Sequence, residues 1–185
     1  GVLAMVGDDH GMTSTDVPAM SVPTFIDLMM PVLYPGNVLE LIEYGLYGWA
    51  LSRYCGAWIG FKTGPETLDT AASVMLPADW PEISLPDYPF PPGGVNIRTP
   101  DHWADQEHRL HEHKIGAAIA FAKANPLNKV LVDSRQRRFG IVTSGVAAFA
   151  VLEALRSLGI DQEHAASLGI TVLKIGMPHP IDEEA

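Results

Sequence analysis

The chain has 185 residues, of which 47% are hydrophobic and 18% are charged, a composition that supplies a packed core and excludes a disordered tail. Twelve Lys and Arg against 22 Asp and Glu give a formal net charge of −10, which repels nucleic-acid phosphates and anionic lipid surfaces. We therefore expect neither a nucleic-acid partner nor a membrane partner. The single cysteine, Cys55, excludes an internal disulfide and an iron–sulfur cluster held by this chain alone, and it fits a reducing cytoplasm.

The first 60 residues alternate between strand and helix patterns. The apolar run 2–6 indicates a buried parallel strand. A short helix is expected over 22–30, a strand over 31–35, a long helix after that strand, and a strand over 58–62. This order is typical of βαβ units in a parallel α/β sheet. Because natural chains seldom begin inside a buried strand, we expect the sequence to be a fragment.

The long helix has clear start and stop signals. Asn37 is the predicted N-cap, and Glu40 stands three residues later, at the spacing of a capping box. Gly56 is a plausible C-terminal stop. Cys55, the residue before it, has Arg53 as its only basic neighbour and is expected to be a packed thiol.

A proline-rich segment follows over residues 77–100. It contains seven of the fifteen prolines, beginning with Pro77, and proline fixes φ and removes a hydrogen-bond donor, so the segment should be extended. Apolar side chains from Trp80 to Ile97 need a surface to lie on. We therefore interpret 77–100 as a strap between residues 1–76 and the rest of the chain.

The second half is predicted to contain another open-sheet α/β unit. A helix is expected from 101 to about 124, followed by a short strand and a basic turn within a connecting segment, 101–138. The second unit is then expected over 139–185. It begins with a strand at 139–143, followed by a helix, a short helix over 162–168, and a closing strand.

The loop Gly-Asp-Asp-His-Gly at 7–11 is the first candidate for chemistry. It follows the carboxyl end of a parallel strand, where ligands bind in α/β sheets. Two carboxylates beside an imidazole can do acid–base work or bind a cation. The alternative is that Asp8 and Asp9 cap the next turn and that His10 is an ordinary loop residue.

Two weaker candidates have structural explanations of their own. Four histidines could suggest a metal site, but their spacing fits no known metal motif and is more typical of a solvated helix start; they are His102, His108, His111 and His113. The Ser144-Gly145 turn before a helix could hold a phosphate. Small residues at that place are more often a tight strand–helix turn.

Seven segments, in order along the chain, resemble the thiamine-diphosphate-dependent 2-oxoacid:ferredoxin oxidoreductases, in particular the fused-chain indolepyruvate branch. They include Gly-Asp-Asp-His-Gly at 7–11, Met-Pro-Val-Leu-Tyr-Pro at 30–35 and Trp-Ile-Gly-Phe-Lys at 58–62. The others are 45–54, 91–98, 139–143 and 174–177. The resemblance therefore extends over nearly the whole chain.

This resemblance implies a parallel-sheet thiamine-diphosphate-binding fold. Residues 1–76 resemble the C-terminal part of its pyrimidine-binding domain, and 139–185 resemble the start of a transketolase C-terminal-like α/β domain. The full-length protein would decarboxylate an aryl pyruvate, similar to indolepyruvate, to an acyl-CoA and pass electrons to ferredoxin. Its cofactors would be thiamine diphosphate with Mg²⁺ and iron–sulfur clusters, none of them held by this segment alone. A cytoplasmic homo-oligomer is expected on the same basis.

The resemblance also selects the candidate site residues. Asp9, His10, Ser14 and Thr15 are expected to line the substrate side of the cofactor pocket. They would bind the substrate carboxylate or carbonyl. The family's activating carboxylate, its diphosphate motif and its cluster cysteines match no residue here, so no catalytic residue or metal ligand is assigned and the segment alone should be inactive. The loop departs from the family pattern over 18–21. Because of this departure, the alternative function is a non-catalytic structural or interaction module.

Overall fold

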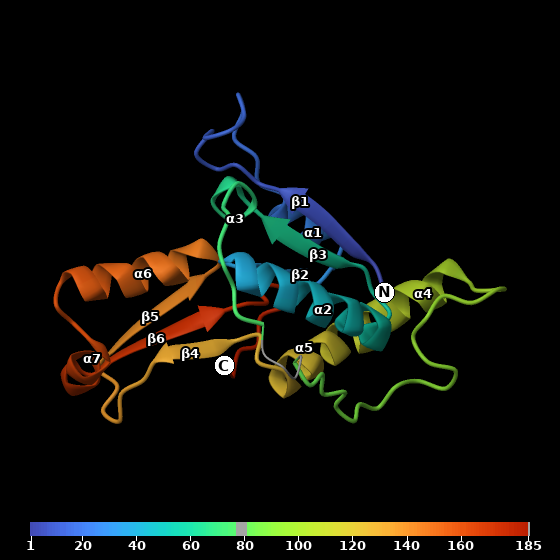
Figure 1. The fold of residues 1–185 in the computed structure, drawn as a ribbon. Helices are drawn as coiled ribbons and strands as arrows, with labels where there is room; N and C mark the ends of the chain where they lie inside the picture. The colour runs from blue at the N-terminus through green and yellow to red at the C-terminus, as the bar shows by residue number, and fades with distance from the viewer. Residues whose placement is uncertain (77–80, 185) are drawn as a thin grey trace.

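The structure is a computed structural model that describes residues 1–76 and 81–184. It contains two three-stranded sheets lying side by side, each with helices packed against it (Figure 1). Pro77 and Trp80 of the predicted strap lie outside the described residues. Among the described helices, none combines the length and hydrophobicity that crossing a bilayer requires.

The first sheet confirms the predicted parallel α/β arrangement. Its strands are β1 (Leu3–Gly7), β2 (Val32–Leu33) and β3 (Ile59–Thr63), in the spatial order β1-β3-β2, all parallel. The prediction of a buried first strand is wrong. Within the described chain β1 pairs only with β3, so it is an edge strand, and its Met5 is 64% exposed.

Three helices accompany this sheet: α1 (Val22–Asp27), α2 (Val38–Cys55) and α3 (Pro65–Leu68). Asn37 caps α2 as predicted, because its side-chain oxygen accepts a hydrogen bond from the backbone N–H of Glu40 at 2.9 Å. The reciprocal half of the capping box is absent, since the Glu40 carboxylate accepts instead from the backbone N–H of Gly36 at 2.7 Å. Gly56 ends the helix in the left-handed conformation. Cys55 is fully buried, and burial raises the pKa of its thiol to about 11.

The described part of the strap, 81–100, contains no regular helix or strand, as predicted. Tyr88 and Phe90 pack against the core of the first unit. Leu85 and Ile97 are 66% and 70% exposed, so the expectation that the strap's apolar side chains are covered is wrong for these two. The strap lies along the first unit and attaches to it by a subset of its side chains.

The predicted helix over 101–124 forms three consecutive segments. They are α4 (Trp103–Arg109), a π-helical turn η1 (Leu110–Lys114) and α5 (Ile115–Ala124). The buried residues of α5 face α2 and complete the main core. This helix therefore belongs structurally to the first unit, which it covers beside α2 (Figure 1).

The second sheet has the order β4-β6-β5. Its strands are β4 (Lys129–Val132), β5 (Phe139–Ser144) and β6 (Ile170–Ile175), with β5 parallel and β4 antiparallel to β6. The helices α6 (Val146–Ser157) and α7 (Gln162–Leu168) connect β5 to β6. The predicted start of the second unit at 139 leaves out β4. This strand belongs to the second sheet because it pairs with β6 along the edge that β5 does not occupy.

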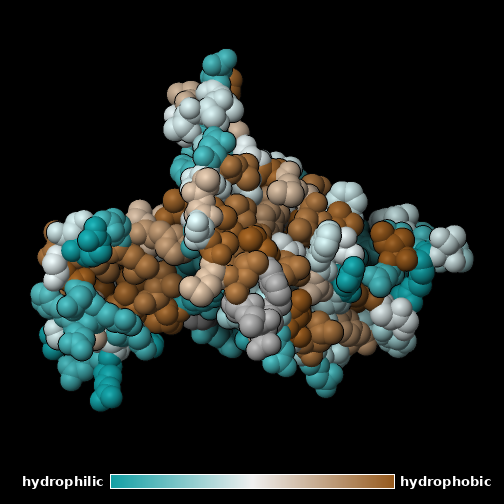
Figure 2. Space-filling view, viewed as in Figure 1, coloured by the Kyte–Doolittle hydropathy of each residue, from teal (hydrophilic) through white to brown (hydrophobic). Residues whose placement is uncertain are grey.

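Some apolar surface is left open by the described residues. Figure 2 shows hydrophobic side chains gathered over α2 and over the second sheet. On α2, Trp49 is 52% exposed beside a groove of about 630 Å³ that it lines with Leu3 and Leu46. On the second sheet, Val130 and Val142 are 50% and 68% exposed. Uncovered apolar area of this kind marks an interaction surface.

The two units meet at a close backbone approach. Gly145 precedes α6 with φ +55° and ψ −138°, a region open essentially to glycine alone. A Cβ atom there would lie 2.3 Å from the ring of Tyr34, and one on Gly36 would lie 2.3 Å from the Gly145 carbonyl oxygen. The loop after β2 and the turn before α6 therefore fit together only because both positions lack a side chain.

Gly145→Ala should lower the free energy of unfolding by about 1–3 kcal/mol, because it adds backbone strain and a clash with Tyr34. Urea unfolding followed by circular dichroism measures the change. Gly140→Ala is the matched control on the same strand–helix unit, since nothing lies within 4 Å of its Cβ position. Equal stability of the two variants would contradict this account of the junction.

Candidate functional site

The candidate site lies at the carboxyl edge of the first sheet. The loop after β1 stands out from the body of the molecule there (Figure 1). His10 on this loop, Tyr34 after β2 and Lys62 near the end of β3 meet at this edge. The parallel order of the strands explains the convergence, because their carboxyl ends all reach the same side.

The carboxylate of Asp9 accepts hydrogen bonds from residues of its own loop. Its two carboxylate oxygens accept hydrogen bonds from the backbone N–H groups of Thr13, Ser14 and Thr15 at 2.7–2.9 Å. The three side-chain hydroxyls also donate to it at 3.0–3.4 Å. These bonds stabilise the ionised form, so the pKa of Asp9 lies well below its ordinary value. Its acceptor capacity is used within the turn.

Ser14 and Thr15 are exposed, but their hydroxyls are directed into the same turn. The Thr15 hydroxyl lies 3.1 Å from Asp9 and 2.9 Å from the carbonyl oxygen of Val17. The structure therefore brings Asp9, Ser14 and Thr15 together as one hydrogen-bonded turn. His10, the fourth predicted residue, is placed differently, against the end of β3.

Asp8 fixes the other end of the loop. Its buried carboxylate accepts two hydrogen bonds from the backbone N–H of Ser21 at 2.9 and 3.0 Å and one from the Ser21 hydroxyl at 2.7 Å. One of its oxygens lies 3.7 Å from the ammonium of Lys62. Consecutive carboxylates thus hold the loop 8–21, since Asp9 binds the turn at 13–15 and Asp8 binds Ser21 at its end. This is the capping alternative considered for the motif.

Lys62 is the group that sequence reasoning missed. It is 7% exposed, and its Nζ lies 2.8 Å from Nε2 of His10 and 4.4 Å above the ring of Tyr34. Burial lowers the pKa of its ammonium, and the nearby Asp8 carboxylate opposes that shift. The signal was present in the sequence: a lysine stands inside an otherwise apolar strand, where a charge needs partners.

A second buried charge pair joins the two units. Nζ of Lys174 on β6 donates to both carboxylate oxygens of Glu40 on α2, at 2.8 and 2.7 Å. It also donates to the hydroxyl of Tyr44 at 3.0 Å, and that hydroxyl donates to the carbonyl oxygen of Leu127 at 3.1 Å. Burial lowers the pKa of Lys174, while Glu40 opposes the shift. This network is structural, since its donors and acceptors satisfy one another.

The weaker candidates do not gather into sites. Of the histidines on 102–113, His108 and His113 approach edge to face with ring centroids 6.2 Å apart, and the ring of His102 caps α4. No group of three or more metal-ligating side chains occurs within residues 1–76 and 81–184. The turn at 144–145 is packed against Tyr34, which favours the tight-turn interpretation over a phosphate site.

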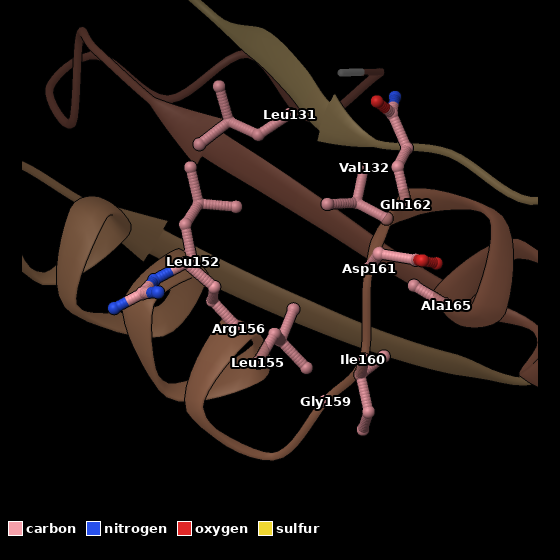
Figure 3. A pocket seen from close by; sticks show the side chains of 10 residues that line it. All are labelled: Leu131, Val132, Leu152, Leu155, Arg156, Gly159, Ile160, Asp161, Gln162 and Ala165. Atoms are coloured by element: carbon pink, nitrogen blue, oxygen red, sulfur yellow. The ribbon is translucent and has the colours of Figure 1, made fainter.

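A cavity of about 480 Å³ lies in the second unit between α6, α7 and β4 (Figure 3). Its walls are mainly apolar, with Leu131, Leu152 and Leu155 among them. Two of the polar side chains at its rim are already paired: Arg156 binds Glu153 and Asp161 caps α7. It contains none of the predicted site residues.

The described residues do not fit a magnesium–diphosphate site. Asp9 is saturated by its own turn and Asp8 by Ser21 and Lys62, and no third carboxylate joins them in a cation site within the described chain. The one cysteine cannot hold an iron–sulfur cluster. What the edge does offer is a buried ammonium next to an exposed imidazole, a combination suited to hydrogen bonding with a carboxylate or carbonyl.

The fold is similar to part of a solved structure. It resembles the solved 2-oxoglutarate:ferredoxin oxidoreductase from Magnetococcus marinus, which has 2-oxoglutarate, coenzyme A and succinyl-CoA bound, with a TM-score of 0.59 and 15% identity. The match covers 97% of this chain and 37% of that chain, so the chain spans just over a third of its length. The α/β fold class predicted from the sequence is confirmed.

A family model matches the second unit. Residues 129–185 match the family model of the indolepyruvate oxidoreductase domain. This match and the fold together confirm the predicted resemblance to the 2-oxoacid:ferredoxin oxidoreductases. The search of curated proteins found no match. The matched segment begins at Lys129, the first residue of β4, in agreement with the extent of the second sheet.

Asp9→Asn should remove part of the acid sensitivity of the fold. The pKa of Asp9 is lowered in the folded state, so between its ordinary value of 3.8 and the lowered one the unfolded chain binds the extra proton. Stability is therefore present above the unfolded pKa and lost as pH falls through the folded pKa. The variant should be less stable at neutral pH, and the difference should shrink on acidification.

Urea unfolding at a series of pH values measures this change. Asp16→Asn, an exposed neighbour on the same loop, is the control and should keep the wild-type profile. Parallel pH profiles for Asp9→Asn and the wild type would refute the role given to this carboxylate.

Breaking the buried pair should be far more costly than breaking a surface pair. Glu40→Gln leaves the Lys174 ammonium uncompensated, and we expect a loss of about 3–5 kcal/mol in the free energy of unfolding. The double variant with Lys174→Met should lose less than the sum of the two single variants. Glu153→Gln, from the exposed pair with Arg156, is the control with little expected effect. Additive losses would show that the pair is not coupled.

Proposed function

We propose that the chain is a segment of a 2-oxoacid:ferredoxin oxidoreductase that carries out thiamine-dependent oxidative decarboxylation of a 2-oxoacid to an acyl-CoA. The observation that carries this proposal is the parallel β1-β3-β2 sheet, with polar side chains gathered at its carboxyl edge, within a fold that matches such an enzyme over 97% of the chain. The oxidoreductase domain match over 129–185 supports it independently.

The proposed substrate is an aryl pyruvate similar to indolepyruvate. The support for this choice is the description of the matching family, indolepyruvate oxidoreductase. The structural neighbour is a 2-oxoglutarate enzyme, so the two comparisons favour the same reaction class with different substrate side chains. The shared part of both substrates is the 2-oxoacid group, which is what the edge containing His10 and Lys62 is proposed to recognise.

The cofactors belong to the full-length protein in this proposal. Thiamine diphosphate with Mg²⁺ would supply the carbanion chemistry, and iron–sulfur clusters would carry electrons to ferredoxin. Coenzyme A would accept the acyl group. The segment alone would hold none of these groups, and its part would be to shape the substrate side of the pocket with the loop of Asp9, His10, Ser14 and Thr15. A cytoplasmic homo-oligomer remains the proposed context.

The full-length protein should reduce ferredoxin or methyl viologen in the presence of indolepyruvate, coenzyme A, thiamine diphosphate and Mg²⁺. His10→Ala should lower kcat/KM for the 2-oxoacid by about 10-fold or more, the effect expected from losing one charge-assisted hydrogen bond. His164→Ala, an exposed histidine on α7, is the control. Absence of 2-oxoacid-dependent reduction would refute the proposed function, and activity with 2-oxoglutarate alone would refute the aryl substrate.

A non-catalytic interaction module is the second candidate. The closed turn favours it, because the Ser14 and Thr15 hydroxyls donate within the loop, and so does the exposed apolar groove beside Trp49. The activity assay separates the two candidates. An inactive full-length protein that nevertheless forms a stable complex would favour the module.

A further inference from the structure

The contact between Lys62 and His10 determines more than the position of the loop. An ammonium has three N–H donors and no acceptor, so a 2.8 Å contact from its Nζ requires a lone pair on Nε2 of the imidazole. The ring is then neutral and its proton is on Nδ1. A doubly protonated ring would set two positive charges against each other at hydrogen-bond distance.

Two contacts of Lys62 stabilise its charged form and oppose the burial that lowers the pKa of its ammonium. The Asp8 carboxylate lies 3.7 Å from Nζ, and the face of the Tyr34 ring lies 4.4 Å from it. Both interactions stabilise an ammonium and neither stabilises a neutral amine. The hydrogen bond therefore runs from Lys62 to His10 and not in the reverse direction. Because Lys62 is 7% exposed and begins from a central strand, it is a fixed donor.

The imidazole has hydrogen-bonding capacity beyond its contact with Lys62. His10 is an exposed residue, and within the part of the chain that the structure describes its ring has no hydrogen-bond partner besides Lys62. The remaining predicted site residues donate inward: the Ser14 and Thr15 hydroxyls are bonded to Asp9, and Thr15 also to Val17. Nδ1–H of His10 is therefore the uncommitted side-chain donor of this loop.

We propose that Lys62 is a positioning residue that fixes His10 as the Nδ1–H tautomer, and that this N–H is the donor offered to the carboxylate or carbonyl oxygen of the 2-oxoacid. The donor role rests on the proposed function, whereas the tautomer does not. A carboxylate or ketone oxygen has only acceptors, so a site that recognises it needs a donor whose proton cannot move to the far side of the ring.

The tautomer is tested by the ring nitrogen resonances of the 185-residue chain. In a long-range proton–nitrogen correlation at about pH 8.5, above the ordinary titration range of histidine, His10 should show a protonated Nδ1 and a bare Nε2. Assignment comes from the signal lost in His10→Asn. A protonated Nε2 or an averaged pattern in the wild type overturns the proposal, and this result does not depend on any lysine variant folding.

Variants of Lys62 test whether this lysine fixes the tautomer of the His10 ring. Lys62→Met should give an averaged pattern of both tautomers, while Lys62→Arg, which keeps a charged donor, should retain the Nδ1–H form. Lys129→Met is the matched control, because that lysine pairs with Glu43 away from this site. An unchanged His10 pattern in folded Lys62→Met would overturn the positioning role.

The donor role is tested by kinetics of the full-length protein. An Asn amide places its N–H near the Nδ1 position and a Gln amide places its own near Nε2. His10→Asn should therefore retain more of kcat/KM for indolepyruvate than His10→Gln, which should lose about 10-fold or more. Equal losses in both variants would overturn the donor role. An inactive wild type would refute the proposed function and the donor role with it, whereas the resonances would still decide the tautomer.

Discussion

The arrangement of the two units depends on the buried contact between Glu40 and Lys174. Both carboxylate oxygens and the ammonium are removed from water, so each needs its partner at hydrogen-bond distance. Because Glu40 lies in the first turn of α2 and Lys174 lies on the central strand of the other sheet, the two units can pack in few ways that satisfy both charges. The close approach of Gly36 and Gly145, between the loop after β2 and the turn before α6, is a second contact between the same units.

A buried lysine paired with a carboxylate occurs in both sheets. Each sheet has three strands, and the central one in each carries a buried lysine near its carboxyl end, Lys62 on β3 and Lys174 on β6. Burial lowers the pKa of both ammonium groups and a carboxylate opposes the shift in both. The two lysines differ in their other contacts. Lys174 donates to Glu40 and Tyr44 in a fully hydrogen-bonded network between the units. Lys62 contacts His10, whose second ring nitrogen has no hydrogen-bond partner within the described residues.

Local patterns were sufficient to predict much of the fold. Short apolar runs located the strands of both sheets, and Asn37 located the start of α2. Two features could not be read from local patterns. The exposure of β1 depends on which strands pair with it, and the contact of Glu40 with Lys174 joins residues 134 positions apart. At the site, the acidic loop was found. A lysine inside an apolar strand shows that Lys62 needs a partner, but its contact with His10 became apparent only when β3 was placed beside β1.

Placing the loop on the sheet also changes what its residues can do. A carboxylate that accepts six hydrogen bonds from its own turn is not available to a ligand, so Asp9 contributes shape, not contact. Asp8 does the same at the other end of the loop through Ser21. A loop held rigidly at both ends loses little conformational entropy when a ligand binds. The main role of the two aspartates is therefore to hold the loop so that the imidazole of His10, in contact with Lys62, has a fixed orientation.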